Sequence, residues 1–259
     1  MKLQNLFRAL KARKTIKMIT ARLFGRAVSG VVIWEGVSPQ DNAPIVAIAT
    51  GFNKPSRNSK TGDMIQIWII RTDTPPHKAV DNGHDLSVCG YCPHRRGQGG
   101  DCYVLPFQAP LRVYREYKAN KYPRATSADI SSLFTGLAVR FGAYGDPAFI
   151  PVHIIKAIES VASVSIGYTH QATNPKVSLA SKDYLKSVFM ASADSARHAA
   201  RLQAQGWKTF RVSYDPEEEP KDSLCKAEAE GLNCLLCQGC DATDNIYIPA
   251  HGQRARVKA

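Results

Sequence analysis

Cysteines are the residues of this 259-residue chain whose number and spacing point most directly to chemistry. There are seven, in two groups: Cys89, Cys92 and Cys102, then Cys225, Cys234, Cys237 and Cys240. Two intervening residues let a pair of thiolates converge on one metal, because the turn between them brings both sulfurs to the same side. The odd count, the close pairs and the lack of a secretory signal pattern argue against disulfides. We therefore expect a cytoplasmic metalloprotein.

The second group holds enough ligands to close a coordination shell by itself. Two residues separate Cys234 from Cys237 and Cys237 from Cys240, and eight residues separate Cys225 from Cys234. Shells of four cysteines hold either tetrahedral zinc or iron–sulfur clusters. The continuous run favours an iron–sulfur cluster, because structural zinc more often uses two separated pairs.

The first group offers three cysteines, with nine residues between Cys92 and Cys102. Three thiolates on a four-iron cluster leave one iron open to a substrate or cosubstrate. The alternative is a closed zinc shell that is completed by a nearby histidine, and the candidates are His94, His84 and His77.

The elements that must position these groups alternate between short apolar strands and helices. Strands are expected at 29–34, 44–50, 64–71, 137–142, 164–168, 189–193, 209–213 and 246–249. Helices are expected at 108–120, 151–161, 182–189 and 195–205, and residues 75–102 should be irregular. Alternation of this kind indicates βαβ units and a parallel sheet. We predict a single α/β metal-binding domain over 29–259, a parallel barrel or partial barrel with irregular cysteine-bearing loops.

Polar residues follow several of the predicted strands. Asp146, Tyr168, His170 and His251 stand at or just after strand ends. Because the loops at the carboxyl ends of barrel strands build active sites, we predict that these four residues line a catalytic site. For Asp194, which directly precedes a predicted helix, capping of that helix is an equally good interpretation.

The charge of the chain is concentrated at its start. The net charge is +12, and eight basic residues precede the first acidic residue, Glu35. Residues 1–28 form a basic extension with the pattern of an amphipathic helix, which could bind nucleic acid as an arm or be a solvated segment. No apolar run approaches the about 20 residues that a membrane span requires. Protein partners are not indicated.

Several short motifs resemble an uncharacterised family of phage- and plasmid-borne proteins. They are NSKTGDMIQ (58–66), CGYCPHR (89–95), CYV (102–104), YGDP (144–147), GYTHQ (167–171) and GWKTFRV (206–212), together with the C-terminal cysteine run and AHG (250–252). The resemblance covers roughly residues 30–252 and implies no particular reaction. If a phage encodes the protein, as the resemblance implies, we expect it in the cytoplasm of the host cell.

A three-cysteine loop after an early strand, followed by a Gly-Asp turn after the next strand, is also similar to radical S-adenosylmethionine enzymes. This resemblance implies that the first cysteine group holds a four-iron cluster, that Gly145 and Asp146 form the cosubstrate turn, and that the C-terminal cysteines carry an auxiliary cluster. The cysteine spacing departs from that superfamily, which usually separates its cysteines by three and then two residues. The functional alternatives are thus an iron–sulfur enzyme that uses S-adenosylmethionine and a zinc-stabilised nucleic-acid-binding protein of phage or plasmid replication.

Overall fold

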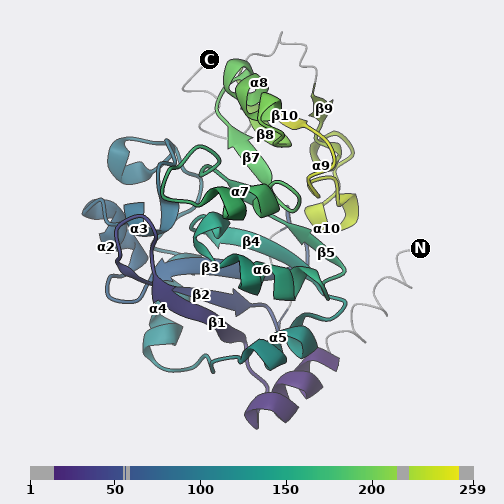
Figure 1. The fold of residues 1–259 in the computed structure, drawn as a ribbon. Helices are drawn as coiled ribbons and strands as arrows, with labels where there is room; N and C mark the ends of the chain where they lie inside the picture. Colours follow the sequence, from purple (N-terminus) through teal and green to yellow (C-terminus); the bar gives the residue numbers. More distant parts are fainter. Residues whose placement is uncertain (1–14, 55, 57–58, 215–221, 251–259) are drawn as a thin grey trace.

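The computed structural model describes residues 15–54, 56, 59–214 and 222–250, and they form a mixed α/β structure with two five-stranded sheets (Figure 1). The strands of the first sheet, in spatial order, are β1 (Gly30–Val37), β2 (Pro44–Thr50), β3 (Ile65–Arg71), β4 (Ala138–Tyr144) and β5 (Val164–Ile166). β1, β2 and β3 pair antiparallel, whereas β3, β4 and β5 pair parallel. The α/β prediction is confirmed, but the expected parallel arrangement is wrong for β1 and β2. Only residues 38–43 join these two strands, too few for the crossover that parallel pairing needs.

The second sheet is parallel throughout. Its strands, in spatial order, are β6 (Tyr168–Thr169), β7 (Met190–Ala193), β8 (Thr209–Ser213), β10 (Ile246–Pro249) and β9 (Ser223–Leu224). Gly167 alone separates β5 from β6, so one stretch of chain contributes to both sheets. A Cβ at Gly167 would lie 2.6 Å from the Phe189 ring, so this junction requires glycine.

Helices connect and cover the strands. They are α2 (Pro76–Asp81), α3 (Leu86–Cys89), α4 (Ala109–Lys118), α5 (Ser127–Phe134), α6 (Val152–Glu159), α7 (Leu179–Leu185), α8 (Ala196–Ala204), α9 (Lys226–Ala229) and α10 (Cys234–Cys237), with 3₁₀ turns η1 (Arg96–Gln98) and η2 (Pro147–Phe149). The predicted irregular segment 75–102 therefore contains two short helices and a 3₁₀ turn, which its weak apolar pattern did not reveal. None of the helices in the described parts of the chain combines the length and apolar character needed to cross a bilayer.

The core lies around the middle strands of the first sheet. β2 is buried from Ile45 to Ala49, and β3 is buried at most of its positions, as expected for strands covered on both faces. Each isoleucine that is fully buried there stabilises the fold by roughly 1.5–3 kcal/mol. The strands that carry the sites are thus anchored in the best-packed part of the molecule.

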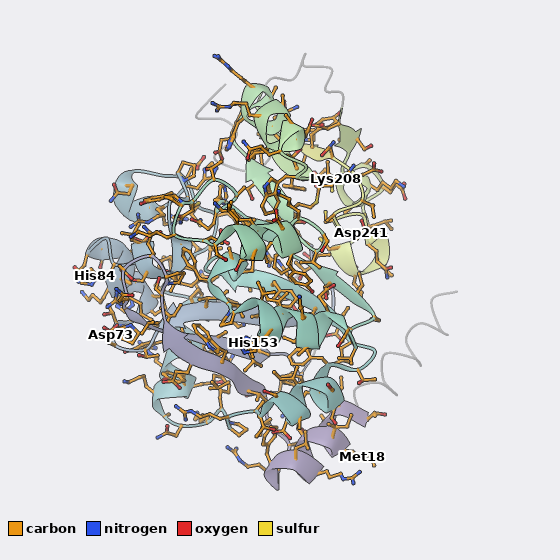
Figure 2. All side chains as sticks on the ribbon, viewed as in Figure 1. Met18, Asp73, His84, His153, Lys208 and Asp241 are labelled. Atoms are coloured by element: carbon orange, nitrogen blue, oxygen red, sulfur yellow. The ribbon has the colours of Figure 1, made fainter. Side chains whose placement is uncertain are left out.

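Part of the predicted basic extension packs on this core. Residues 15–24 are helical, with Ile16 and Thr20 buried and Ile19 against the core. Met18, which is exposed, lies on the outer side of this helix (Figure 2). The remaining residues of the extension, 1–14, lie outside the described residues.

Candidate metal centres

The first cysteine group gathers beyond the end of β3. Cys89 ends α3, Cys92 follows in the next turn, and Cys102 returns to them through a backbone hydrogen bond from its amide to the His94 carbonyl (2.8 Å). The three cysteines line one small cavity of about 30 Å³, together with Tyr144 and Arg95. The structure thus brings Cys102 to the Cys-x2-Cys pair, as the sequence predicted.

Charged side chains surround the partly buried thiols of this cavity. Burial, the nearby Asp85 carboxylate and the other two cysteines raise the pKa of Cys89 well above its ordinary value. Arg95 lies beside the group and is itself buried, with its Nη2 2.5 Å from Asp85 Oδ1. The raised pKa favours the protonated thiol at Cys89, so a metal that bound this thiol would have to release its proton.

The spread of the sulfurs distinguishes a mononuclear site from a cluster. Sulfurs on one tetrahedral zinc lie about 3.8 Å apart, given a Zn–S length of about 2.3 Å. Among the described residues, the ligand atoms of His94, His170 and Asp194 all lie within 4.8 Å of one another. A polynuclear cluster accepts a wider spread of sulfurs than one zinc ion, because each thiolate binds a different iron.

The turn after β4 packs directly against the cysteine loop. The Asp146 amide donates to the Val88 carbonyl (2.7 Å), one residue before Cys89. Gly145 has a φ of +78°, and a Cβ there would lie 2.6 Å from the Ile69 carbonyl oxygen, so only glycine fits. Gly145 and Asp146 therefore lie next to the first cysteine group, where the resemblance put the cosubstrate turn.

The Asp146 carboxylate joins the ends of two strands. It accepts hydrogen bonds from the Ala148 amide (3.0 Å), Thr169 Oγ1 (2.7 Å), the His170 amide (2.8 Å) and Gln171 Nε2 (3.1 Å). Four donors occupy the lone pairs that a carboxylate offers, so none is left for a substrate. Burial raises the pKa of Asp146 in spite of these bonds. Its geometry gives it a positioning role, in contrast to the catalytic role predicted from the sequence.

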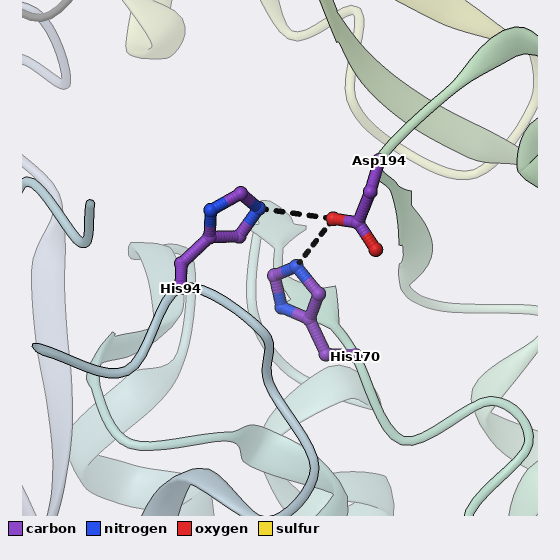
Figure 3. A group of neighbouring side chains, drawn as sticks. All are labelled: His94, His170 and Asp194. Carbon is purple, nitrogen blue, oxygen red and sulfur yellow. Dashed lines mark hydrogen bonds and ion pairs between the residues drawn. The ribbon is translucent and has the colours of Figure 1, made fainter. Parts of the chain in front are cut away.

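Three side chains that are distant in sequence meet beside the first cysteine group (Figure 3). Asp194 Oδ1 lies 2.9 Å from His94 Nε2 and 3.6 Å from His170 Nε2. His94 Nδ1 also contacts Asp101, and His198 Nδ1 lies 3.2 Å from Asp194 Oδ2. This set of two histidines and a carboxylate is one that divalent metals accept.

The protonation of this His–Asp cluster (His94, His170 and Asp194) favours a charged hydrogen-bond network. Burial lowers the pKa of His170, but its bonds to Asp194 and Cys92 outweigh that effect and raise it to about 10. The pKa of Asp194 is lowered by the two histidines, which overcome the opposing effect of burial. Without a metal this arrangement holds a proton at His170, and a metal that bound here would have to displace that proton.

The geometry changes two sequence interpretations. Both ring nitrogens of His94 contact carboxylates, and His84 is exposed at the outer edge of the molecule (Figure 2), so neither completes a cysteine shell. Neither His94, His84 nor His77 lines the cysteine cavity. The cap of α8 is Ser195, which accepts from the His198 amide, and this leaves Asp194 free to meet the histidines.

The second cysteine group forms a separate centre beside the second sheet. Cys234 and Cys237 stand at the two ends of α10, while Cys225 and Cys240 are buried. Burial, together with the charge of the other cysteines, raises the pKa of Cys240 to about 12, although a hydrogen bond from Tyr168 opposes this. All four cysteines are thus close enough to interact, as the sequence predicted.

The two other predicted catalytic residues, Tyr168 and His251, are not part of the His–Asp cluster in the described structure. Tyr168 hydrogen-bonds Cys240 and its ring packs on Phe210 with the centroids 4.8 Å apart, so it belongs to the second cysteine group and not beside His170. His251 lies outside the described residues. The sequence missed Asp194 and Asp101 as partners of the histidines, and no local motif marks them.

No protein-family model, curated protein or solved structure matches this chain. The functional argument therefore rests on the geometry of the two cysteine groups and their surroundings.

Proposed function

We propose that this protein is an iron–sulfur enzyme of the radical S-adenosylmethionine type with two cluster sites. The observation that carries the proposal is the convergence of three cysteines beyond the carboxyl end of β3, directly against the Gly145–Asp146 turn that follows β4. β3 and β4 are parallel neighbours, so both loops lie at the same edge of the sheet.

The strand order supports a partial barrel. β3, β4, the β5–β6 stretch, β7, β8 and β10 pair parallel in chain order, and Gly167 carries the chain from one sheet to the other. Six parallel strands in sequence, with helices between most of them, form an arc of the kind that barrel enzymes close. The antiparallel strands β1 and β2 extend one edge of this arc.

The cysteine ligands fit the iron–sulfur clusters that the proposal requires. Cys89, Cys92 and Cys102 supply three thiolates, and none of the histidines that the structure describes lines their cavity. A four-iron cluster held by these three cysteines would supply single electrons, and S-adenosylmethionine would be the source of radicals. The four cysteines of the second group would hold an auxiliary cluster.

The residues around the first site have roles that follow from their contacts. Arg95 lies beside the thiolates and offsets their negative charge, while Asp85 holds its guanidinium in place. The His–Asp cluster stands beside Cys92 and can hold a proton at His170 over the neutral range. Asp146 fixes the turn that would face the cosubstrate.

The proposal is tested by incubating the anaerobically purified, reduced protein with S-adenosylmethionine and measuring its cleavage by liquid chromatography. We expect cleavage by the wild type and by Cys237→Ser, and none by Cys92→Ser, because only the first group has an open position. Equal cleavage by wild type and Cys92→Ser, or none by iron-loaded wild type, would refute it. Protein that binds zinc alone and retains nucleic acid would instead support the zinc-stabilised nucleic-acid-binding alternative.

A further inference from the structure

A second cavity, of about 370 Å³, lies next to the first cysteine group. Its walls come from β3, β4 and the cysteine loop and include Gln66, Trp68, Tyr103 and Arg140. Val104 lines both this cavity and the cysteine cavity, so the two share a wall. The volume is within the range of about 300–1,000 Å³ that small-molecule sites occupy.

Arg140 is a buried cation in the wall of this cavity, and its partners are neutral. Its Nη2 donates to the Tyr103 hydroxyl (2.7 Å), and its Nη1 lies 3.5 Å from Gln66 Oε1. Within the described parts of the chain, no carboxylate forms an ion pair with it. Among the described residues, the thiol of Cys234 also lies close enough to Arg140 to interact with its charge, and a thiolate there would offset part of it. Burying a charge that has no hydrogen-bonded partner of opposite sign is costly, so an anion in the cavity would stabilise Arg140 further.

Two other buried arginines, each close to a carboxylate, provide a comparison with Arg140. Arg95 is 8% exposed and pairs with Asp85 at 2.5 Å. Arg211 is 3% exposed and lies 3.7 Å from Asp222. Arg140 is equally buried, at 8%, and lines a cavity as Arg95 does, but no carboxylate of the described residues pairs with it.

The walls indicate what kind of anion would fit. A guanidinium binds carboxylates and phosphates through paired hydrogen bonds, and Gln66 adds a neutral polar contact. The Trp68 indole is fixed by its bond to Thr50 Oγ1 (2.8 Å), and its ring offers an apolar surface. The Tyr103 side chain is 73% exposed, which leaves it room to move when a ligand takes its place on the guanidinium.

We propose that this cavity binds the substrate, an organic carboxylate or phosphate, through an ion pair with Arg140. The anion site stands on the cavity and on the buried charge, while its assignment to the substrate rests on the proposed function. The shared Val104 wall would place the bound molecule beside the first cysteine group, within reach of the chemistry proposed there.

The test uses inorganic phosphate as the probe on the full, anaerobically purified chain. Thermal unfolding is followed in sodium phosphate and in sodium chloride at equal ionic strength. For the wild type we expect a saturable rise in Tm of roughly 3–5 °C at ten times Kd. Arg140→Met should abolish the rise, and Arg112→Met, which removes the same charge from a side chain that is 79% exposed, should keep it.

A second readout separates a ligand-binding arginine from a structural one. Because Arg140 has no carboxylate partner, Arg140→Met without phosphate should melt no lower than the wild type. A large loss of Tm in Arg140→Met, together with no phosphate effect on the wild type, would overturn the proposal. Loss of half the bound iron in Arg140→Met would also overturn it, since Arg140 would then serve to neutralise cysteine thiolates.

The two proposals fail in different ways. If the protein is colourless but phosphate still raises its Tm in a way that depends on Arg140, the iron–sulfur function is refuted and the anion site stands. If iron-loaded protein cleaves S-adenosylmethionine but phosphate does not change its Tm, the anion site is refuted and the proposed function stands.

Discussion

The Gly145–Asp146 turn gives the sharpest structural prediction, through the substitution Gly145→Ala. Alanine at a φ of +78° costs about 1 kcal/mol for the left-handed backbone. Its Cβ would also lie 2.6 Å from the Ile69 carbonyl oxygen and 2.7 Å from Ile69 Cβ, neither of which is the far end of a flexible side chain. Overpacking of this kind adds about 1–3 kcal/mol, so the total loss of unfolding free energy is about 2–4 kcal/mol.

Gly136→Ala is the matched control. Gly136 has a φ of +70°, and nothing lies within 4 Å of the position its Cβ would take, so the substitution costs the backbone term alone. By thermal unfolding followed by circular dichroism, we expect a Tm loss of about 5–15 °C for Gly145→Ala and about 2–4 °C for Gly136→Ala. Gly145→Ala should also lower iron binding, because Asp146 is bonded to Val88 next to Cys89. Equal losses of Tm in the two variants would show that the turn is not packed as described.

Three further predictions address the same framework. Asp146→Asn should lower the unfolding free energy by about 2–4 kcal/mol in urea titrations, because the amide nitrogen cannot accept from donors that the carboxylate now satisfies. Thr169→Ser is the control: it keeps the hydroxyl that donates to Asp146 and accepts from the Gln171 amide, and it should cost about 1 kcal/mol for the lost methyl group. A loss in Thr169→Ser as large as that in Asp146→Asn would contradict this. Cys92→Ser and Cys237→Ser should each lose about half of the bound iron, measured by metal analysis, whereas loss of all the iron in either would show that the two groups do not bind independently. Burial raises the pKa of Glu116, but hydrogen bonds from Tyr122 and Arg112 outweigh this and hold the pKa below its ordinary value. The contribution of Glu116 to stability is therefore complete above pH 4.5 and is lost as the pH falls through the folded-state pKa. Glu116→Gln should reduce the drop in Tm below pH 4.5, and an identical fall of Tm with pH in the variant and the wild type would refute this.

Elements with a strong apolar pattern were predictable, and those set by tertiary contacts were not. The bounds of β2, β8 and β10 agree with the sequence because their alternating or continuous apolar residues are bounded by polar turns. The helix α5 was missed although Thr126 and Asp129 form a capping box, since SADISSLF is short and its three serines favour turns and caps over helix interiors. The antiparallel pairing of β1 with β2 could have been predicted from the sequence, because the loop between these two predicted strands is short.

The candidate site was predictable only where its residues are local in sequence. The cysteine groups were found because spacing reports directly on convergence. The Asp194 interaction with His94 and His170 joins three loops, and the chain order alone does not show that these loops meet. Arg140 was hidden for another reason: its significance lies in the missing carboxylate partner, which only packing reveals.

Metal analysis of protein purified without oxygen tests the central claim most directly. Two four-iron clusters predict about eight iron and about eight sulfide per chain, with a broad absorbance band near ~400 nm. Colourless protein that contains one or two zinc ions and no sulfide would contradict the account.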